Sequence, residues 1–279
     1  MSITKQIKKA VRENAKNRYQ ARMSGGRVFS NFGEQQIIEK YIAKLSIDNE
    51  TIVDIGAGDG VRRSNSYSLI ANGWIGLGIE SDPRAFAKLA DAYRHYPNAF
   101  ACRFKADPEN ICALLASYGV ERDLGILSLD IDSYDFYVLD AVLTHFRPRL
   151  VVTEINEKVP PPIRFVADVD PDFVMKDHFF GYSITALAEL LKKHDYALLE
   201  LEYNNAFIAP AELSGASPVS VSAAYNAGYL DRSDRREKFR PNANMEILHS
   251  MTADQGVEFL NNFFSAFKGK YQIGIEEVE

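Results

Sequence analysis

The feature that most constrains the fold of this chain is a regular alternation of strand-like and helix-like segments. Short apolar runs typical of buried strands recur from Thr51 onward, and segments whose apolar residues have helical spacing separate them. Strands joined through helices lie parallel to one another, and the helices cover both faces of the sheet. The sequence therefore predicts an α/β fold with a doubly wound, mostly parallel, Rossmann-like seven-stranded sheet and helices on both faces.

The predicted elements begin and end at clear breaks in the pattern. The expected strands are 51–57, 74–80, 99–106, 124–132, 149–156 and 196–210. The expected helices are 33–45, 64–73, 83–96, 108–119, 136–146, 183–195 and 253–269. Ser183 is the expected cap of the helix at 183–195. Residues 156–173 hold three consecutive prolines, so we expect them to lack regular structure and to form a lid or a substrate wall.

Three regions follow from this pattern. We expect residues 1–45 to form an N-terminal helical region that is basic at its start. Residues 46–210 form the Rossmann-like core, and residues 211–279 form a C-terminal extension packed on that core. The basic start is compatible with a solvated helical face, with docking to an acidic partner or with covering an anionic substrate. Its seven basic residues stand against the single acid Glu13 and are Lys5, Lys8, Lys9, Arg12, Lys16, Arg18 and Arg22.

Composition excludes several classes of protein. Hydrophobic residues make up 46% of the 279 residues, which suits a large core and not a disordered chain. No apolar run approaches the roughly 20 residues of a membrane span, and the N-terminus lacks the apolar centre of a signal peptide. Cys102 and Cys112 have no metal-like spacing, so we expect a reducing, cytoplasmic location. The net charge of −6 disfavours nucleic acid as a partner.

Three glycines at alternate positions follow the first strand and indicate that a ligand lies against the backbone there. They are Gly56, Gly58 and Gly60, and Asp54 precedes them. A dinucleotide fingerprint needs a third small residue where this chain has Val61, which weakens a pyrophosphate interpretation. An acid beside exposed backbone N–H groups better fits a ligand that carries an amine and a carboxylate. S-adenosylmethionine is such a ligand.

The ends of the next two strands support a nucleoside-like ligand. Glu80 stands at the tip of the second strand, where an acid accepts two hydrogen bonds from a ribose diol in doubly wound nucleotide sites. After the third strand, Asp107 is positioned to accept a hydrogen bond from an adenine amino group. Each acid alone is typical of a surface loop. Acids at three successive strand ends favour a binding site.

Four segments of the chain resemble a known family, the class I S-adenosylmethionine-dependent methyltransferases, and within it the FkbM-related branch. They read DIGAGDGVRRSNS, GWIGLGIESD, LSLDIDSYDFYVL and TEIN. The resemblance covers roughly residues 30 to 210 and implies a methyltransferase core with S-adenosyl-L-methionine as cofactor. It also places Asn65, in the first segment, among the cofactor-binding residues. Ser133 departs from the pattern, because relatives often have glycine there.

Acidic and amide side chains follow the fourth and fifth strands. Asp130 and Asp132 end the fourth, and Glu154 and Asn156 end the fifth, which is its neighbour in this fold. Such oxygen ligands suit Mg²⁺ or another divalent cation, which lowers the pKa of a substrate hydroxyl. Without a metal, Asp130 or Asp132 is a candidate general base, and His178 is another. The same acids, Asp130 in particular, also suit loop capping and orientation of the cofactor.

These features predict a methyltransferase that uses S-adenosylmethionine to methylate an oxygen of a small-molecule or sugar-like hydroxyl. Positioning of that hydroxyl against the methyl group supplies much of the rate, and deprotonation adds a smaller factor. Two alternatives stay open: an NAD-dependent oxidoreductase, and a non-catalytic protein that only binds S-adenosylmethionine. The predicted partner is a small-molecule acceptor, and an oligomer is compatible with the sequence.

Overall fold

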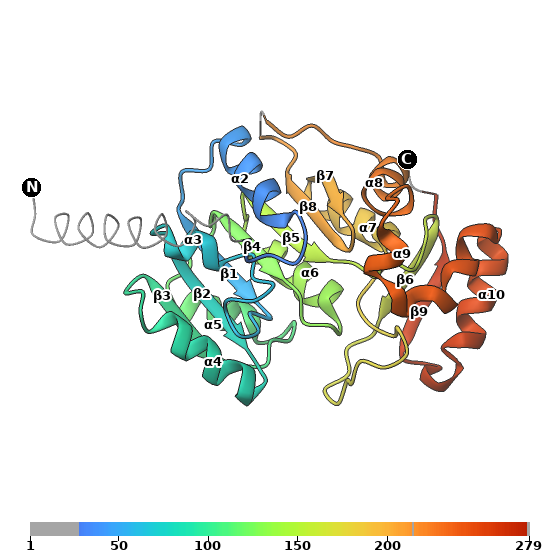
Figure 1. The fold of residues 1–279 in the computed structure, drawn as a ribbon, viewed down its shortest axis with the longest axis horizontal. Helices are drawn as coiled ribbons and strands as arrows, with labels where there is room; N and C mark the ends of the chain where they lie inside the picture. Colours follow the sequence, from blue (N-terminus) through green and yellow to red (C-terminus); the bar gives the residue numbers. More distant parts are fainter. Residues whose placement is uncertain (1–27, 214, 278–279) are drawn as a thin grey trace, which may run out of the picture.

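A seven-stranded, mostly parallel sheet forms the centre of the computed structural model, which describes residues 28–213 and 215–277 (Figure 1). Its strand order is β3-β2-β1-β4-β5-β8-β7. The strands are β1 (Thr51–Ile55), β2 (Ile75–Glu80), β3 (Ala99–Arg103), β4 (Ile126–Leu129), β5 (Leu150–Glu154), β7 (Tyr196–Glu202) and β8 (Asn205–Pro210). Pairs from β3 to β5 are parallel, whereas β8 runs antiparallel to both β5 and β7. The predicted fold class is confirmed.

Helices cover both faces of the sheet. One apolar cluster joins helices α2 (Glu34–Lys44), α3 (Tyr67–Ala71) and α4 (Pro83–Tyr93) to one face. The other joins α5 (Ile111–Ser117), α6 (Asp135–His145), α7 (Ile184–His194) and α8 (Val221–Tyr225) to the opposite face. Within β1, Ile52 belongs to the first cluster and Val53 to the second, because successive strand residues point to opposite faces. This alternation explains why the buried strands read as continuous apolar runs.

The register of the sheet brings the predicted site residues to one edge. Ile55 pairs with Ile79 of β2 and with Leu129 of β4. The residues that follow these three positions, Gly56, Glu80 and Asp130, therefore emerge together at the carboxyl ends of the strands. In doubly wound folds this edge binds the ligand.

Side-chain caps set where two of the helices begin. The Asp82 carboxylate accepts hydrogen bonds from the backbone N–H groups of Arg84 and Ala85, and Pro83 occupies the first turn of α4. The Ser183 hydroxyl accepts from the N–H of Ala186 at the start of α7, as the sequence predicts. Each cap fixes the start of its helix to the residues directly before it. For α4 these residues follow β2, and for α7 they end the long segment that follows β6.

The prediction that residues 156–173 contain no regular structure is wrong. The three prolines are followed by strand β6 (Ile163–Ala167), which pairs antiparallel with β9 (Tyr271–Ile275) near the end of the chain. Proline disfavours a strand only where its missing N–H is needed, and Ile163 lies just beyond the last proline. The predicted strand 196–210 is also divided, since a turn at Tyr203, with φ of 55°, separates β7 from β8.

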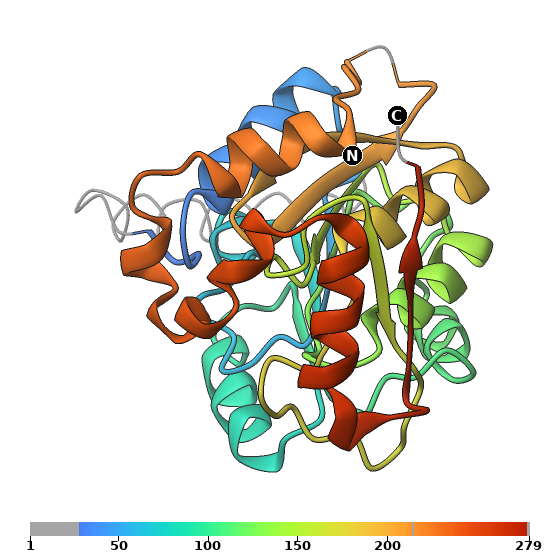
Figure 2. The same cartoon turned by 90° about the vertical axis from the view of Figure 1, so that its right-hand side faces the viewer.

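The C-terminal extension is built around the β6–β9 pair and helix α10 (Ala253–Phe263). Figure 2 faces this part of the molecule and shows α10 and β9 in red, beside β6. Phe165 of β6 packs against Phe264 and Tyr271 in a separate apolar cluster. The remaining short elements are η1 (Asn226–Leu230), α9 (Arg235–Lys238), η2 (Arg240–Asn244), η3 (Glu246–Ser250) and η4 (Ser265–Phe267).

Several sequence predictions concern the ends and surfaces of the chain. The basic cluster between Lys5 and Arg22 lies outside the described residues. None of the helices within 28–213 and 215–277 is long and apolar enough to cross a membrane. Cys102 and Cys112 are both free thiols.

Candidate active site

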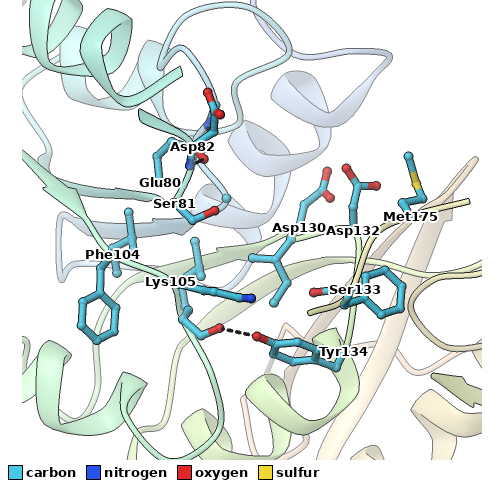
Figure 3. Close-up of a pocket in the computed structure, with 17 residues that line it drawn as sticks. Glu80, Ser81, Asp82, Phe104, Lys105, Asp130, Asp132, Ser133, Tyr134 and Met175 are labelled. Atoms are coloured by element: carbon cyan, nitrogen blue, oxygen red, sulfur yellow. Dashed lines mark hydrogen bonds between the residues drawn. The ribbon is translucent and has the colours of Figure 1, made fainter. Parts of the chain in front are cut away.

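A cavity of about 640 Å³ opens at the carboxyl ends of β1, β2, β3 and β4 (Figure 3). We call it the first cavity. In Figure 3 Glu80, Ser81 and Asp82 lie on one side of it, Phe104 and Tyr134 below, and Asp130 and Asp132 side by side opposite. Its volume is within the range of about 300–1,000 Å³ that is typical of small-molecule sites.

The glycine turn forms one wall of the first cavity. Gly56, Gly58 and Gly60 all adopt positive φ, of 89°, 57° and 74°. A Cβ on Gly56 would lie 1.6 Å from the carbonyl oxygen of Asp130, so only glycine allows these two strand ends to approach. A Cβ on Gly58 would meet nothing within 4 Å, and Gly58 lines the cavity. The backbone at Gly58 is therefore open to a ligand.

Glu80 is held at the tip of β2 by the glycine turn. One carboxylate oxygen accepts a hydrogen bond from the N–H of Gly58 at 2.9 Å, and the other accepts from the N–H of Asp82 at 2.7 Å. A carboxylate has about four acceptor positions, so each oxygen keeps capacity for a further donor. Glu80 thus presents two fixed acceptors to the first cavity.

Asp54 does not line the first cavity. It is buried within the sheet, where its carboxylate accepts a hydrogen bond from the hydroxyl of Ser66. Burial raises the pKa of Asp54 to about 6, although hydrogen bonds from Ser66 and Ser128 act in the opposite direction. Asp54 therefore ties the loop after the glycine turn to the sheet.

Asp107 and Asn65 also lie away from the walls of the first cavity. The Asp107 carboxylate accepts hydrogen bonds from the N–H groups of Glu109 and Asn110 before α5. The Asn65 amide donates to the hydroxyl of Ser128 at 3.2 Å. Asn65 lines a second cavity instead.

Three carboxylates gather where β4 and β5 end. Asp130, Asp132 and Glu154 each have one oxygen within 4.8 Å of the others. Desolvation, followed by repulsion from Asp132 and Asp135, raises the pKa of Asp130 to about 8. Burial raises the pKa of Asp132, and the positive charge of Lys158 partly offsets this rise. Burial, followed by repulsion from Asp130, raises the pKa of Glu154. The cluster therefore holds protons or attracts a cation near neutral pH.

Asp135 has a different role from these three acids. Its carboxylate accepts hydrogen bonds from the N–H groups of Ile131 and Ser133 and so closes the loop after β4. Within this loop Asp132 adopts the left-handed region, with φ of 54°. Ser133, where the resemblance expects glycine, does not adopt a positive φ. The loop geometry aims Asp130 and Asp132 at the cavity, as Figure 3 shows.

Asn156 and His178 line neither cavity. Asn156 is fully buried, and its amide donates to the carbonyl oxygens of His178 and Phe180. The His178 ring contacts the side-chain oxygen of Asn244 at 3.1 Å, and burial followed by the charge of Lys158 lowers its pKa. In this structure both residues fasten the segment before α7.

The second cavity, of about 400 Å³, lies on the other side of Asp130 and Asp132, and both residues line the two cavities. Its other walls come from Asn31–Glu34, from the β7–β8 turn and from the C-terminal extension at 238–242. Sequence reasoning missed all of these wall residues, because no motif marks them. Phe173 and Met175 of the loop before α7 line the first cavity and fall in or next to the predicted wall segment.

Comparisons with known proteins give structural matches alone. No family model matches the sequence, so the FkbM-related branch is not confirmed, and no curated protein matches it either. An S-adenosylmethionine-dependent methyltransferase from Clostridium acetobutylicum is 9% identical, with 68% of this chain and 95% of that one covered and a TM-score of 0.43. An amino pentose methyltransferase from Micromonospora echinaspora is 10% identical, with 69% and 96% covered and a TM-score of 0.43.

A third match is magnesium protoporphyrin IX methyltransferase from Synechocystis with bound S-adenosylmethionine. It is 14% identical, with 72% of this chain and 94% of that one covered and a TM-score of 0.40. The three solved structures are all methyltransferases. At identities of 9 to 14%, none of them fixes what this chain binds.

Proposed function

We propose that this chain is an S-adenosylmethionine-dependent methyltransferase that methylates an oxygen of a small-molecule or sugar-like hydroxyl. The observation that carries the proposal is the pair of cavities that share Asp130 and Asp132. One cavity has the features of a nucleoside site, and the other has room for a second molecule. A reaction between two bound molecules at the shared residues follows naturally from this arrangement.

The residues of the first cavity fit the methyl donor. Glu80 offers two acceptors to the paired hydroxyls of a ribose, and the open backbone at Gly58 allows close approach of the amino-acid part. Phe104 and Tyr134 supply aromatic surface near the place expected for adenine. The predicted contact between Asp107 and the adenine amino group requires that the Asp107 carboxylate accept one donor beyond its present three.

The geometry disfavours an NAD-dependent oxidoreductase. A dinucleotide pyrophosphate binds at a helix N-terminus that begins directly at the glycine turn. Here α3 begins only at Tyr67, and the residues between Gly60 and Ser66 form turns and bends. The Val61 side chain also occupies the position of the third small residue. The glycine turn therefore lacks the helix that a pyrophosphate needs.

The Asp130 and Asp132 side chains also argue against a protein that merely binds the donor. Asp135 alone closes the loop through backbone hydrogen bonds, whereas Asp132 accepts none from the described part of the chain. Asp130 interacts with the Glu154 carboxyl and not with the loop backbone, and Asp130 and Asp132 both line both cavities. Acids that served packing alone would be bonded as Asp135 is.

The mechanism that we propose uses Asp130 and Asp132 at the junction of the cavities. When bound, S-adenosylmethionine would supply a methyl group on a positively charged sulfur. The acceptor oxygen would then bond to the methyl carbon as the carbon–sulfur bond breaks, with the electron pair of that bond going to sulfur. The hydroxyl proton passes to the carboxylate pair, where the raised pKa of about 8 at Asp130 makes a carboxylate a competent base near neutral pH.

A divalent cation is the second way to use the same carboxylates. The oxygens of Asp130, Asp132 and Glu154 are hard ligands, and their mutual closeness fits one ion. Such an ion would lower the pKa of the acceptor hydroxyl. Asn156, the fourth predicted ligand, is committed through its amide N–H groups to two backbone carbonyls. The three acids are therefore the ligand set that we propose for this alternative.

The ligand that the purified protein carries tests the proposed function. We expect mass spectrometry of the released small molecules to find S-adenosylmethionine or its demethylated product, S-adenosylhomocysteine. Protein stripped of ligand should bind added S-adenosylhomocysteine. Release of a nicotinamide dinucleotide, or no binding of S-adenosylhomocysteine at millimolar concentration, would contradict the proposal.

A further inference from the structure

The second cavity presents hydrogen-bond acceptors to its occupant. Five asparagines line it: Asn31, Asn65, Asn204, Asn205 and Asn242. Four of them donate through their amide N–H groups to neighbouring side chains, at Ser128, Glu154, Glu34 and Glu157.

These bonds fix the amides and leave carbonyl oxygens for a ligand. The side-chain oxygens of Asn65, Asn205 and Asn242 accept no hydrogen bond from the described residues, yet they are not among the buried atoms without a partner. They are therefore accessible from the cavity. Together with the carboxylates of Asp130 and Asp132 they favour a ligand that carries several donors, and Arg63 and Lys238 in the same lining can donate to its oxygens.

Two aromatic rings supply the apolar part of the second cavity. Phe32 and Phe239 have ring centroids 5.5 Å apart at an angle of 42°. Tyr203 packs against both rings, at 4.5 and 5.7 Å, and the Lys238 ammonium lies 5.0 Å from the Phe32 ring. Because the face of an aromatic ring is electron-rich, it attracts the C–H groups of a saturated ring.

We propose that the second cavity binds the methyl acceptor and that the acceptor is a polyhydroxylated saturated ring of the saccharide class. This inference rests on the proposed methyltransferase function and specifies its substrate. Several hydroxyl groups satisfy the fixed amide and carboxylate acceptors, while the C–H face of the ring packs on Phe32 and Phe239. A flat aromatic acceptor with one hydroxyl would leave most of these acceptors without a donor, which is costly once water is displaced.

The C-terminal extension takes part in this recognition. Phe239 and Asn242 belong to it, and Asn242 is held by the buried carboxylate of Glu157 at 2.7 Å. Asn31 and Phe32 come from the other end of the chain. Acceptor choice is therefore set by segments outside the strands that form the first cavity.

The first experiment compares acceptors with purified enzyme and S-adenosylmethionine, and measures formation of S-adenosylhomocysteine. The panel contains monosaccharides and simple glycosides, and an equal set of phenols and catechols. We expect turnover with members of the saccharide set and none above background with the phenols. Methylation of phenols alone, or of amines alone, would overturn the inference while leaving the methyltransferase function intact. Absence of any binding of S-adenosylhomocysteine would overturn both.

Variants test whether the second cavity is where the saccharide binds. Asn31→Ala removes an exposed amide that makes no hydrogen bond with the described part of the chain, so folding is spared. We expect KM for the best saccharide to rise about five- to thirtyfold, with the Kd of S-adenosylhomocysteine unchanged. The matched control is Asn72→Ala, at the exposed end of α3 and in neither cavity. Equal KM values in the two variants would contradict the assignment of this cavity.

A second variant tests the aromatic wall. Phe239→Leu keeps apolar bulk but removes the ring face, and we expect about a tenfold rise in KM for the saccharide. Phe100→Leu is the control, because Phe100 is exposed on β3 and lines neither cavity. An unchanged KM in Phe239→Leu would show that the acceptor does not pack on this ring.

Discussion

The two cavities that meet at Asp130 and Asp132 are built in different ways. The first takes most of its walls from consecutive loops after β1, β2, β3 and β4, whose register fixes their ends at one edge. The second combines residues 31–34, the β7–β8 turn and residues 238–242, which are far apart in the sequence. The walls of the first cavity are thus set by the register of the sheet, and the walls of the second are set by segments that pack around the sheet.

This difference separates two kinds of function. In the donor site that we propose, local motifs contact the ligand, chiefly the glycine turn and Glu80. The shape of the second cavity depends on contacts between distant segments. An example is Glu202, which accepts hydrogen bonds from Gly33 and from Arg232. Changes in the surrounding segments can therefore alter the acceptor without disturbing the donor.

We expect the largest effect from substitution of an acid that both cavities share. Asp132→Asn keeps the shape of the side chain, and asparagine tolerates the left-handed φ of 54° at this position. We expect turnover to fall about a hundredfold or more, because the variant loses a charge needed for a base or for a cation. Affinity for S-adenosylhomocysteine, measured by calorimetry, should change little. Asp91→Asn, exposed on α4, is the control.

Chelation then distinguishes the two mechanisms at these acids. If Asp130, Asp132 and Glu154 hold a divalent ion, exhaustive treatment with a chelator should abolish turnover and leave binding of S-adenosylhomocysteine intact. That outcome would identify the cation mechanism in place of the metal-free base. Full activity after chelation, with a rate that falls as pH drops and the carboxylates protonate, would exclude the ion and leave Asp130 or Asp132 as the base.

Among the variants that alter the first cavity alone, we expect Glu80→Ala to cause the largest loss of affinity for S-adenosylhomocysteine. Glu80→Ala removes both acceptors for the ribose hydroxyls, and each strong bond to a charged group contributes about 1.5 to 3 kcal/mol. Calorimetry with S-adenosylhomocysteine measures the loss. The variant Glu109→Ala, exposed before α5, serves for comparison. Unchanged affinity in Glu80→Ala would remove this residue from the donor site.

A matched pair of glycines separates backbone strain from ligand contact. Gly58 and Gly119 both have positive φ, of 57° and 70°, and a Cβ on either would meet nothing within 4 Å. Substitution of each by alanine should cost about 1 kcal/mol of stability through the left-handed backbone. Gly58→Ala alone should weaken binding of S-adenosylhomocysteine, by about tenfold, because its methyl group enters the first cavity. Equal affinities in the two variants would show that the ligand does not touch Gly58.

The sequence predicted the first cavity better than the second for a physical reason. Strand ends in a parallel sheet are brought together by topology, so Gly58, Glu80 and Asp130 could be placed at this cavity from their positions after apolar runs. Asn156 stands at a similar position just after β5, yet its side chain is turned to the carbonyl oxygen of His178 and fastens a loop. Strand order does not reveal which way a loop residue turns.

Long-range pairing explains the other failures. Strand β6 was missed because its partner β9 lies about a hundred residues later in the chain, and the prolines before Ile163 suggested a loop. Phe239 and Asn242 carry no motif, and only packing of the extension brings them to Asp130. Tertiary contacts of this kind leave little signal in local sequence patterns.

The smallest expected effect concerns stability. Asp130 has a pKa raised to about 8, so the folded state prefers its protonated form, and its contribution to stability is lost as pH rises from the ordinary value of 3.8 through about 8. Asp130→Asn should therefore unfold at a higher temperature than the parent at pH 9, with a much smaller difference at pH 4. The gain is on the order of 1 kcal/mol, because the carboxylate reaches solvent through the cavities. Thermal melting with a chelator present measures it, and identical curves at pH 9 would contradict the shift.

A crystal structure of the protein with S-adenosylhomocysteine tests the central claim most directly. The account predicts that the ribose hydroxyls contact Glu80, that the amino-acid part lies along Gly58, and that the sulfur faces Asp130 at the opening into an empty second cavity. Adenosine seated in the second cavity, or a ligand that leaves Glu80 untouched, would contradict it.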